Sequence, residues 1–192
     1  MMAGARLALG LAALVLVALA SLASGFPAHA DQKSPRVAGL LDRLGNAKTP
    51  AEAEQLESVI WKLWVHHEDS EIQRFMAIGI SAMTSGNLEM AFTAFDRVVG
   101  MDPEFAEGWN KRATVNYMME RLDASMNDIE RTLALEPRHF GALSGMGLIF
   151  DAIDNPKAAA DAWEKALGIH PFMPGVRRHI RELRQREKGR AI

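Results

Sequence analysis

The chain has 192 residues, of which 48% are hydrophobic, and this is enough for one domain or one short repeat array with a sizeable core. Its formal net charge of -2 argues against a nucleic-acid partner recognised through overall charge. It contains no cysteine, which excludes disulfides, thiolate metal sites, cysteine nucleophiles and a lipid-modified cysteine.

Residues 1–30 predict a secretory signal peptide. Arg6 is the only charged side chain before an apolar run over residues 7–22, and Ala28-His29-Ala30 supplies small residues for cleavage. The alternative is an uncleaved membrane anchor, because an apolar run of this length approaches that needed to span a bilayer. We expect cleavage after Ala30 and an exported mature protein that begins at Asp31.

Residues 31–71 predict a pair of helices. Apolar residues recur at helical spacing in two stretches, residues 37–44 and residues 56–64, and Thr49-Pro50 is a start signal for the second helix. We interpret the pair either as a cap or as a degenerate repeat.

An internal repeat of 34 residues dominates the remaining chain. Pro103, Pro137 and Pro171 follow this period, which lies in the range typical of stacked repeats. Each unit contains two segments with helical spacing, separated by turn residues such as Ser85-Gly86-Asn87. The aligned columns alternate in size: Phe75, Trp109 and Leu143 are large, Gly79, Ala113 and Gly147 are small, and Phe95, Ile129 and Trp163 are large.

Residues 174–192 predict a final helix with one apolar and one basic face. Val176, Ile180 and Leu183 share the apolar face. The basic residues are Arg177, Arg178, Arg181, Arg184, Arg186 and Lys188. We interpret this charge as the solvated outer face of a terminal cap, since end repeats need one. The alternative is attraction to an acidic partner or to anionic lipid headgroups.

The alternation of large and small residues, with a proline closing each 34-residue unit, resembles the tetratricopeptide-repeat (TPR) family. The resemblance implies an all-α fold, an α–α solenoid of three TPR helix pairs over residues 72–105, 106–139 and 140–173. The sequence departs from the family pattern at Asn116, Ser125 and the turn at Glu120, where an aromatic residue, alanine and glycine are usual.

The resemblance also implies a concave groove, lined by the first helix of each pair, that holds a peptide or a partner helix. The residues expected to project into it are Met76, Ile80, Met83, Asn110, Lys111, Thr114, Tyr117, Ser144, Leu148 and Asp151. This set favours an apolar or mixed peptide, because methionine adapts to different surfaces and the other groups form hydrogen bonds. The alternative is that several of these residues only complete the core between repeats. Arg112 is expected to form a structural ion pair with Asp128.

No pattern in the sequence predicts catalysis, a cofactor or a metal site. His66-His67-Glu68-Asp69 is the only cluster of histidines and acids, but adjacent residues diverge on a helix, so we predict an exposed helix end. Ser144 lacks the surrounding residues and the preceding strand of a nucleophile elbow.

We therefore predict a non-catalytic periplasmic adaptor or scaffold that binds a protein or peptide and no nucleic acid. One alternative is an assembly factor or subunit that packs into an envelope complex through its convex face. Another is a protein that binds the membrane surface through the basic last helix and is released by salt. An enzyme would require a pocket with converging acids or histidines, which the sequence does not predict.

Overall fold

The computed structural model describes residues 35–190, so the predicted signal peptide lies outside the described part. All regular structure in this range is helical, which confirms the predicted all-α class. The helices are α1 (Pro35–Gly45), α2 (Pro50–Val65), α3 (Ser70–Thr84), α4 (Leu88–Met101), α5 (Ala106–Met118), α6 (Leu122–Leu135), α7 (Phe140–Ala152), α8 (Pro156–Ile169) and α9 (Val176–Arg190). Across residues 35–190 no helix meets the length and hydropathy that spanning a bilayer requires.

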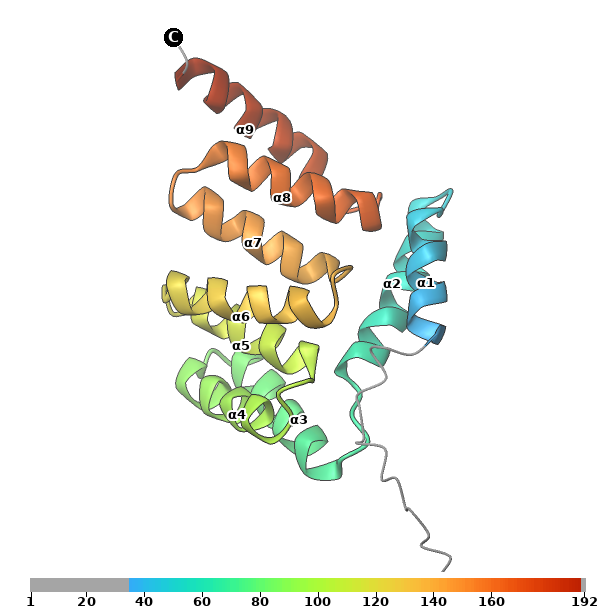
Figure 1. Cartoon of the computed structure of the whole chain (residues 1–192), viewed down its shortest axis with the longest axis vertical. Coiled ribbons are helices and arrows are strands. Elements are labelled where there is room, and N and C mark those ends of the chain that lie inside the picture. The colour runs from blue at the N-terminus through green and yellow to red at the C-terminus, as the bar shows by residue number, and fades with distance from the viewer. Residues whose placement is uncertain (1–34, 191–192) are drawn as a thin grey trace, which may run out of the picture.

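Helices α3 to α8 form a stack of three antiparallel pairs, as the predicted solenoid requires. The pairs are α3 with α4, α5 with α6, and α7 with α8, and each pair packs on the next through α4–α5 and α6–α7 contacts. Helix α9 packs on α8, so the α3–α4 layer forms one end of the stack and α9 forms the other (Figure 1).

The repeating columns of large and small residues meet inside each pair. A Cβ atom added to Gly79 of α3 would lie 2.5 Å from the ring of Phe95 in α4, and one added to Gly147 of α7 would lie 2.7 Å from Trp163 in α8. The absence of a side chain at these glycines therefore lets the paired helices approach closely enough for the aromatic rings to fill the space between them.

Local signals define the helix ends. The Asn87 and Asn155 side chains accept bonds from the N–H groups of Met90 and Ala158 and so cap α4 and α8. Thr49 caps α2 in the same way, and Pro50 occupies its first turn.

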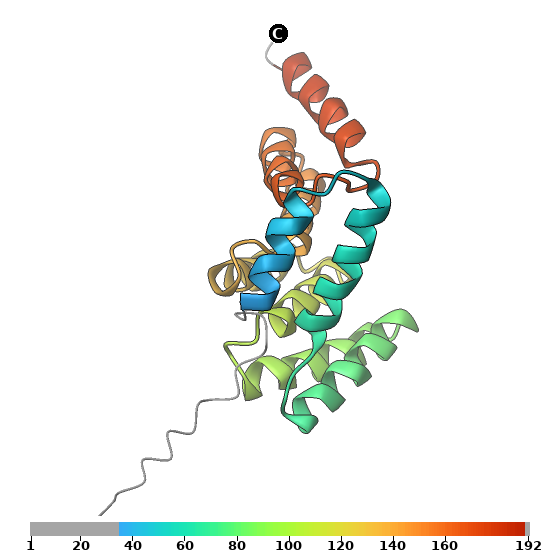
Figure 2. The ribbon, with the colours of Figure 1, turned by 90° about the vertical axis from the view of Figure 1, so that its right-hand side faces the viewer.

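The N-terminal hairpin, α1 with α2, does not extend the stack. Helix α2 packs against α5, and α1 packs against α8, so the hairpin lies beside the stack rather than on its α3–α4 end (Figure 2). The pair is therefore not placed as a fourth repeat stacked on the first. It crosses the edge where the second helix of each pair ends and the next pair begins.

Candidate partner-binding groove

A small hollow of about 60 Å³ lies between α5 and α7. Its lining residues are Asn110, Ala113, Thr114, Tyr117, Ser125, Ile129, Gly141, Gly145 and Leu148. Two glycines of α7, Gly141 and Gly145, are among these residues, and a Cβ atom added to them would point toward Trp61 of α2 and Ile129 of α6, respectively. A Cβ atom added to Gly145 would lie 3.1 Å from Cδ1 of Ile129, so even an alanine there would begin to fill the hollow.

Four of the predicted groove residues line the hollow. Leu148 is 44% exposed, Thr114 is exposed and Tyr117 is half-buried. Asn110 is buried, and its Nδ2 atom donates to Glu107 Oε2 at 3.0 Å, so its amide already has a partner inside the fold. The Thr114 hydroxyl donates to the Asn110 carbonyl at 2.9 Å, so it can offer a ligand its acceptor lone pairs. Leu148, Tyr117 and Thr114 therefore offer an apolar and hydrogen-bonding surface from two helices.

Three other predicted groove residues are half-buried and lie outside the hollow. Ile80 and Met83 pack against the core of the α3–α4 pair. The Ser144 hydroxyl donates to the carbonyl of Phe140 at 2.9 Å, within its own helix. None of these three residues lines the hollow.

The structure corrects the placement of Met76, Lys111 and Asp151. Met76 is 0% exposed and belongs to the core of the α3–α4 pair. Lys111 Nζ lies 3.0 Å from Glu107 Oε1 and 5.1 Å from the ring centroid of Trp61 in α2. Asp151 is bound from α9, where its carboxylate lies 2.6 Å from Arg186 and 3.1 Å from His179. These side chains are therefore engaged inside the fold.

Helix α2 covers one end of the groove, which the sequence did not indicate. The Trp61 ring lies where it would meet a Cβ atom added to Gly141, at 2.6 Å. Trp64 is stacked on His139, with ring centroids 4.1 Å apart, and also contacts Phe140. These aromatic contacts fix the hairpin over the first turn of α7, so the groove is closed at this end.

Glu107 is a buried carboxylate beneath the covered end. His139 Nδ1 accepts the N–H of Ala142 at 3.0 Å, which places the ring proton on Nε2, 2.9 Å from Glu107 Oε2. Burial by itself would raise the pKa of Glu107, but the Lys111 ammonium and the contacts with His139 outweigh burial, so the pKa lies below its ordinary value. Glu107 therefore remains ionised and joins α5 to the start of α7.

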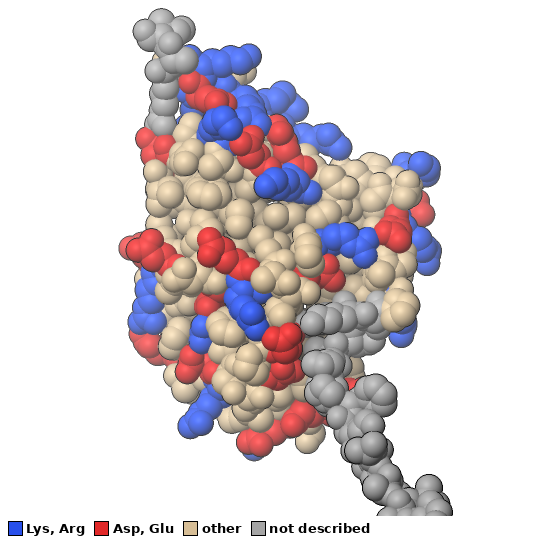
Figure 3. All heavy atoms as spheres, viewed as in Figure 1, with Lys and Arg blue, Asp and Glu red and all other residues tan. Residues whose placement is uncertain are grey.

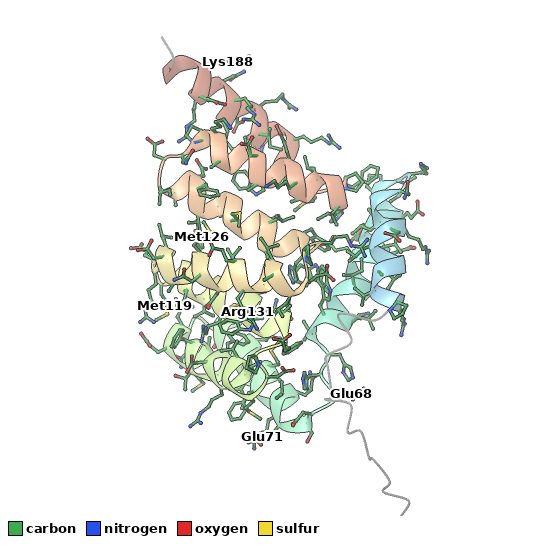
Figure 4. All side chains as sticks on the ribbon, in the orientation of Figure 1. Glu68, Glu71, Met119, Met126, Arg131 and Lys188 are labelled. Atoms are coloured by element: carbon green, nitrogen blue, oxygen red, sulfur yellow. The ribbon has the colours of Figure 1, made fainter. Side chains whose placement is uncertain are left out.

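The cluster at residues 66–69 is not simply an exposed helix end. His66 and Glu68 are exposed, and Glu68 lies in the link between α2 and α3 (Figure 4). His67 is buried, however: its Nε2 lies 3.0 Å from Asp102 Oδ2, and its Nδ1 accepts the N–H of Asp69 at 3.0 Å. His67 thus ties the link to the end of α4. Within residues 35–190, histidines and acids nowhere gather in a group of three that could hold a metal ion.

Arg112 and Asp128 form a bidentate ion pair inside the second repeat. Arg112 Nε and Nη2 donate to the two Asp128 oxygens at 2.9 and 2.6 Å, and Nη1 donates to Asp96 of α4 at 2.6 Å. Burial would lower the pKa of Arg112, but bonds to Asp128 and then Asp96 outweigh it and raise the pKa. Asn116, which stands where an aromatic residue is usual, also donates to Asp128, at 2.9 Å. The departure from the family pattern is thus part of this network.

Two of the basic residues of α9, Arg184 and Arg186, are paired with acids of the third repeat. Arg184 contacts Asp161 at 2.6 Å and Glu164 at 3.1 Å, and Arg186 contacts Asp151 and Asp154. Lysine and arginine side chains gather at this end of the molecule with acidic side chains among them (Figure 3). These contacts join α9 to both helices of the third repeat, as a cap requires.

Comparison with known proteins gives relatives for the whole described array. No family model matches the chain. A TPR repeat-containing protein from Rhizobium etli is 32% identical over 179 residues, covering 86% of this chain and 88% of that protein. Small glutamine-rich tetratricopeptide repeat-containing protein 2 from Saccharomyces cerevisiae is 21% identical and covers 76% of this chain, but this chain spans only 43% of that protein.

Solved structures share the fold. The first TPR of Spaghetti (RPAP3) bound to the HSP90 peptide SRMEEVD has a TM-score of 0.60 at 16% identity, covering 63% of this chain and 96% of that chain. The crystal structure of MamA protein has a TM-score of 0.57 at 19% identity, covering 78% and 82%. At such identities the likeness shows the architecture alone.

Proposed function

Because this chain belongs to the tetratricopeptide-repeat family, we propose that it is a non-catalytic adaptor that binds an apolar segment of a partner protein in the groove between α5 and α7. The observation that carries the proposal is the hollow over Gly141 and Gly145, with Leu148, Tyr117 and Thr114 accessible at its rim. One aliphatic side chain of the partner enters the hollow, and polar groups at the rim hold its backbone.

The size of the hollow selects the side chain that enters. A cavity of about 60 Å³ is less than half of the roughly 150 Å³ that accommodates a benzene molecule. An aliphatic side chain therefore fits better than an aromatic ring. The partner approaches from the end of the groove away from α2, because Trp61 covers the end at Gly141.

Relatives support the class of ligand. The Spaghetti structure contains an HSP90 peptide, and the TPR2B domain of yeast Sti1 has been solved in a complex with pHsp70. Those ligands belong to those proteins. Here Lys111 is held by Glu107 and Trp61, and glycines stand at residues 141 and 145, so the groove offers little positive charge to an acidic tail. An apolar segment suits these residues better.

We place this activity in the periplasm, on the basis of the signal peptide predicted over residues 1–30. Expression with the native leader in a bacterial host, followed by fractionation and N-terminal sequencing, tests this. A periplasmic product that begins at Asp31 is expected, whereas a membrane-bound product that retains residues 1–30 would reject cleavage.

Site-specific photo-crosslinking in cells tests the groove. A photoreactive residue replaces Thr114 or Leu148, and a control carries it at Met101, which is 39% exposed at the end of α4 and does not line the hollow. The same partner should be captured from both groove positions and not from the control. Gly145→Leu should reduce capture, because the new side chain occupies the hollow, while circular dichroism verifies that the helices remain folded. Equal capture at Met101, or capture unaffected by Gly145→Leu, would reject the groove as the binding site.

A further inference from the structure

The α3–α4 layer exposes an apolar face at its end of the stack. Ile78 is 40% exposed and Met90 is 52% exposed, and together with Phe75, Thr93, Glu89 and Ala94 they line an open depression of about 380 Å³. This face lies outside the groove between α5 and α7. Large exposed side chains that adjoin one another on a soluble protein mark an interaction surface more often than isolated ones do.

The internal repeat shows what normally covers this part of the layer. Leu143 and Met146 of α7 occupy the positions of Phe75 and Ile78 two periods later; Leu143 is buried, and Met146 packs against Ile129 and Met126 of α6 in the preceding repeat. Met126 lies on the side of α6 that faces α7 (Figure 4). For α3 the preceding helix is α2, which packs on α5 instead. The first repeat therefore lacks the neighbour that its successors have.

The residues of the first repeat are apolar where the second is polar or small. Ile78 stands at the position of Arg112, which reaches back to Asp96 of the preceding repeat. Met90 stands at the position of Ala124. A neighbour on this face thus meets no charge at Ile78, and it must itself be apolar to bury Ile78 and Met90 favourably.

We propose that the occupant of this face is the same face of a second copy, in a two-fold symmetric dimer. A head-to-tail stack is disfavoured, because the opposite end of the molecule is α9, whose exposed Arg177, Arg181 and Lys188 would lie against an apolar surface. Two apolar faces related by a two-fold axis bury one another instead.

The charges along the face are complementary under the same operation. Arg74 and Arg97 lie toward the end where α3 begins and α4 ends, and Glu89 lies at the other end, where α4 begins. Glu71, near Arg74, lies at this extremity of the molecule (Figure 4). A two-fold axis that lies in the plane of the contact, perpendicular to the helices, turns the two faces toward one another and reverses the direction of the helices, so the basic end of one copy meets Glu89 of the other. The dimer therefore joins like apolar surfaces and opposite charges.

Sedimentation velocity of the chain from Asp31 onward, which contains every described helix, tests the dimer. The wild-type protein should convert from monomer to dimer as its concentration rises through the micromolar range. Met90→Glu should raise the dimer dissociation constant by at least about tenfold, because it buries a carboxylate in an apolar contact. Ile153→Glu is the matched control: it adds the same charge at a residue of similar exposure away from the face, and it should leave the dimer intact.

A charge exchange distinguishes a second copy from any other occupant. Glu89 also lies 3.3 Å from Arg121 of its own chain, an exposed pair that the dimer contact would share. Arg97→Glu and Glu89→Arg should each weaken the dimer, and the double variant should restore part of the lost affinity, because each copy supplies both ends of the contact. A wild-type protein that stays monomeric at all concentrations, or a dimer that Met90→Glu leaves unchanged, would overturn the proposal. Failure of the double variant to recover any affinity would overturn the two-fold arrangement. None of these variants touches the groove, so the dimer and the proposed adaptor function are tested separately.

Discussion

Glu120 adopts a backbone conformation that favours glycine. Its φ of 58° lies in the left-handed region, as does that of Gly86, which stands at the same position of the first repeat with a φ of 78°. The family pattern places glycine in this turn, and the structure shows why: the chain must reverse between the paired helices. A side chain in this conformation costs free energy that glycine avoids.

Glu120→Gly removes the strain of this conformation but makes the unfolded chain more flexible, and the two effects oppose one another. The net result should be a rise of about 0.5–1 kcal/mol in the free energy of unfolding. Urea unfolding followed by circular dichroism measures the difference. Asp154, with a φ of 60°, serves as a comparison: its carboxylate binds Arg186, so Asp154→Gly should gain less. A lower stability of Glu120→Gly would show that the turn is not strained.

Glu107 makes stability depend on pH on the acid side. Because its pKa is lowered in the folded protein, the contribution of its carboxylate is complete above the ordinary pKa of 4.5 and is lost as the pH falls through the folded value. Glu107→Gln should lower the free energy of unfolding by about 1–3 kcal/mol at pH 7, since Lys111 and His139 lose a charged partner.

The difference between wild type and Glu107→Gln should narrow as the pH falls from 7 to about 3, because below pH 4.5 the unfolded wild-type chain binds a proton at Glu107 more readily than the folded protein does. Chemical unfolding at both pH values measures this. A difference of the same size at both would show that the substitution acts through packing rather than through the charge of Glu107.

The repeat pattern could indicate contacts within one repeat, but it could not indicate contacts with helices outside the repeats. Arg112 and Asp128 lie on two helices of one unit, so the repeat pattern indicates their contact, and the structure contains it. Lys111 and Asp151 are bound by α2 and α9. These helices lie outside the 34-residue period, so no aligned column could indicate where they pack.

Met76 illustrates a different limit of the sequence. Residues 76, 80 and 83 share a helix face by spacing, which suggested a common direction into the groove. That face borders the core of the α3–α4 pair, so Met76 is buried while Ile80 and Met83 are half-buried. The spacing of residues shows which of them share a helix face, but it does not show which residues of that face are buried.

At the scale of helix pairs, close approach depends on Gly147. Its missing side chain leaves room for the Trp163 ring, which would lie 2.7 Å from an added Cβ atom. Gly147→Ala should therefore lower the free energy of unfolding by about 1–3 kcal/mol, because α7 and α8 must separate or Trp163 must move.

Gly39→Ala is the matched control, since nothing lies within 4 Å of a Cβ atom added at this position in α1. It should instead raise stability by about 0.5–1 kcal/mol, because alanine favours the helix. Thermal unfolding of the two variants separates steric contact from helix propensity. Similar changes in both would mean that the α7–α8 pair adjusts without cost.

At the scale of the whole molecule, the N-terminal hairpin adds contacts between segments that are far apart in the sequence, which a simple repeat array lacks. Helices of a repeat array contact only their neighbours along the stack, so such arrays can fray from their ends. Here Arg138 binds Asp42 of α1 at 2.6 Å, and His170 binds Glu57 of α2 at 3.1 Å, across 96 and 113 residues of chain. The hairpin thus bridges the second and third repeats, and we infer that it stabilises them together.

Trp64 provides the test of this coupling, because it is buried and stacked on His139 at the start of α7. Trp64→Ala should cost about 3–5 kcal/mol and release the hairpin. Hydrogen exchange should then speed up in α1 and α2, and also in α7 and α8, by tenfold or more, because their shared interface is lost.

Phe95→Ala removes a buried ring of the α3–α4 pair, whose core meets the hairpin at Val65 of α2, and is the matched control. It should accelerate exchange in α3 and α4 more than in α7 and α8. If Trp64→Ala instead accelerates exchange only in α1 and α2, the hairpin is an appendage on an array that holds itself together. If exchange in α7 and α8 rises together with exchange in α1 and α2, the third repeat depends on a hairpin that precedes the first repeat. The groove between α5 and α7 then depends on the hairpin as well as on the third repeat.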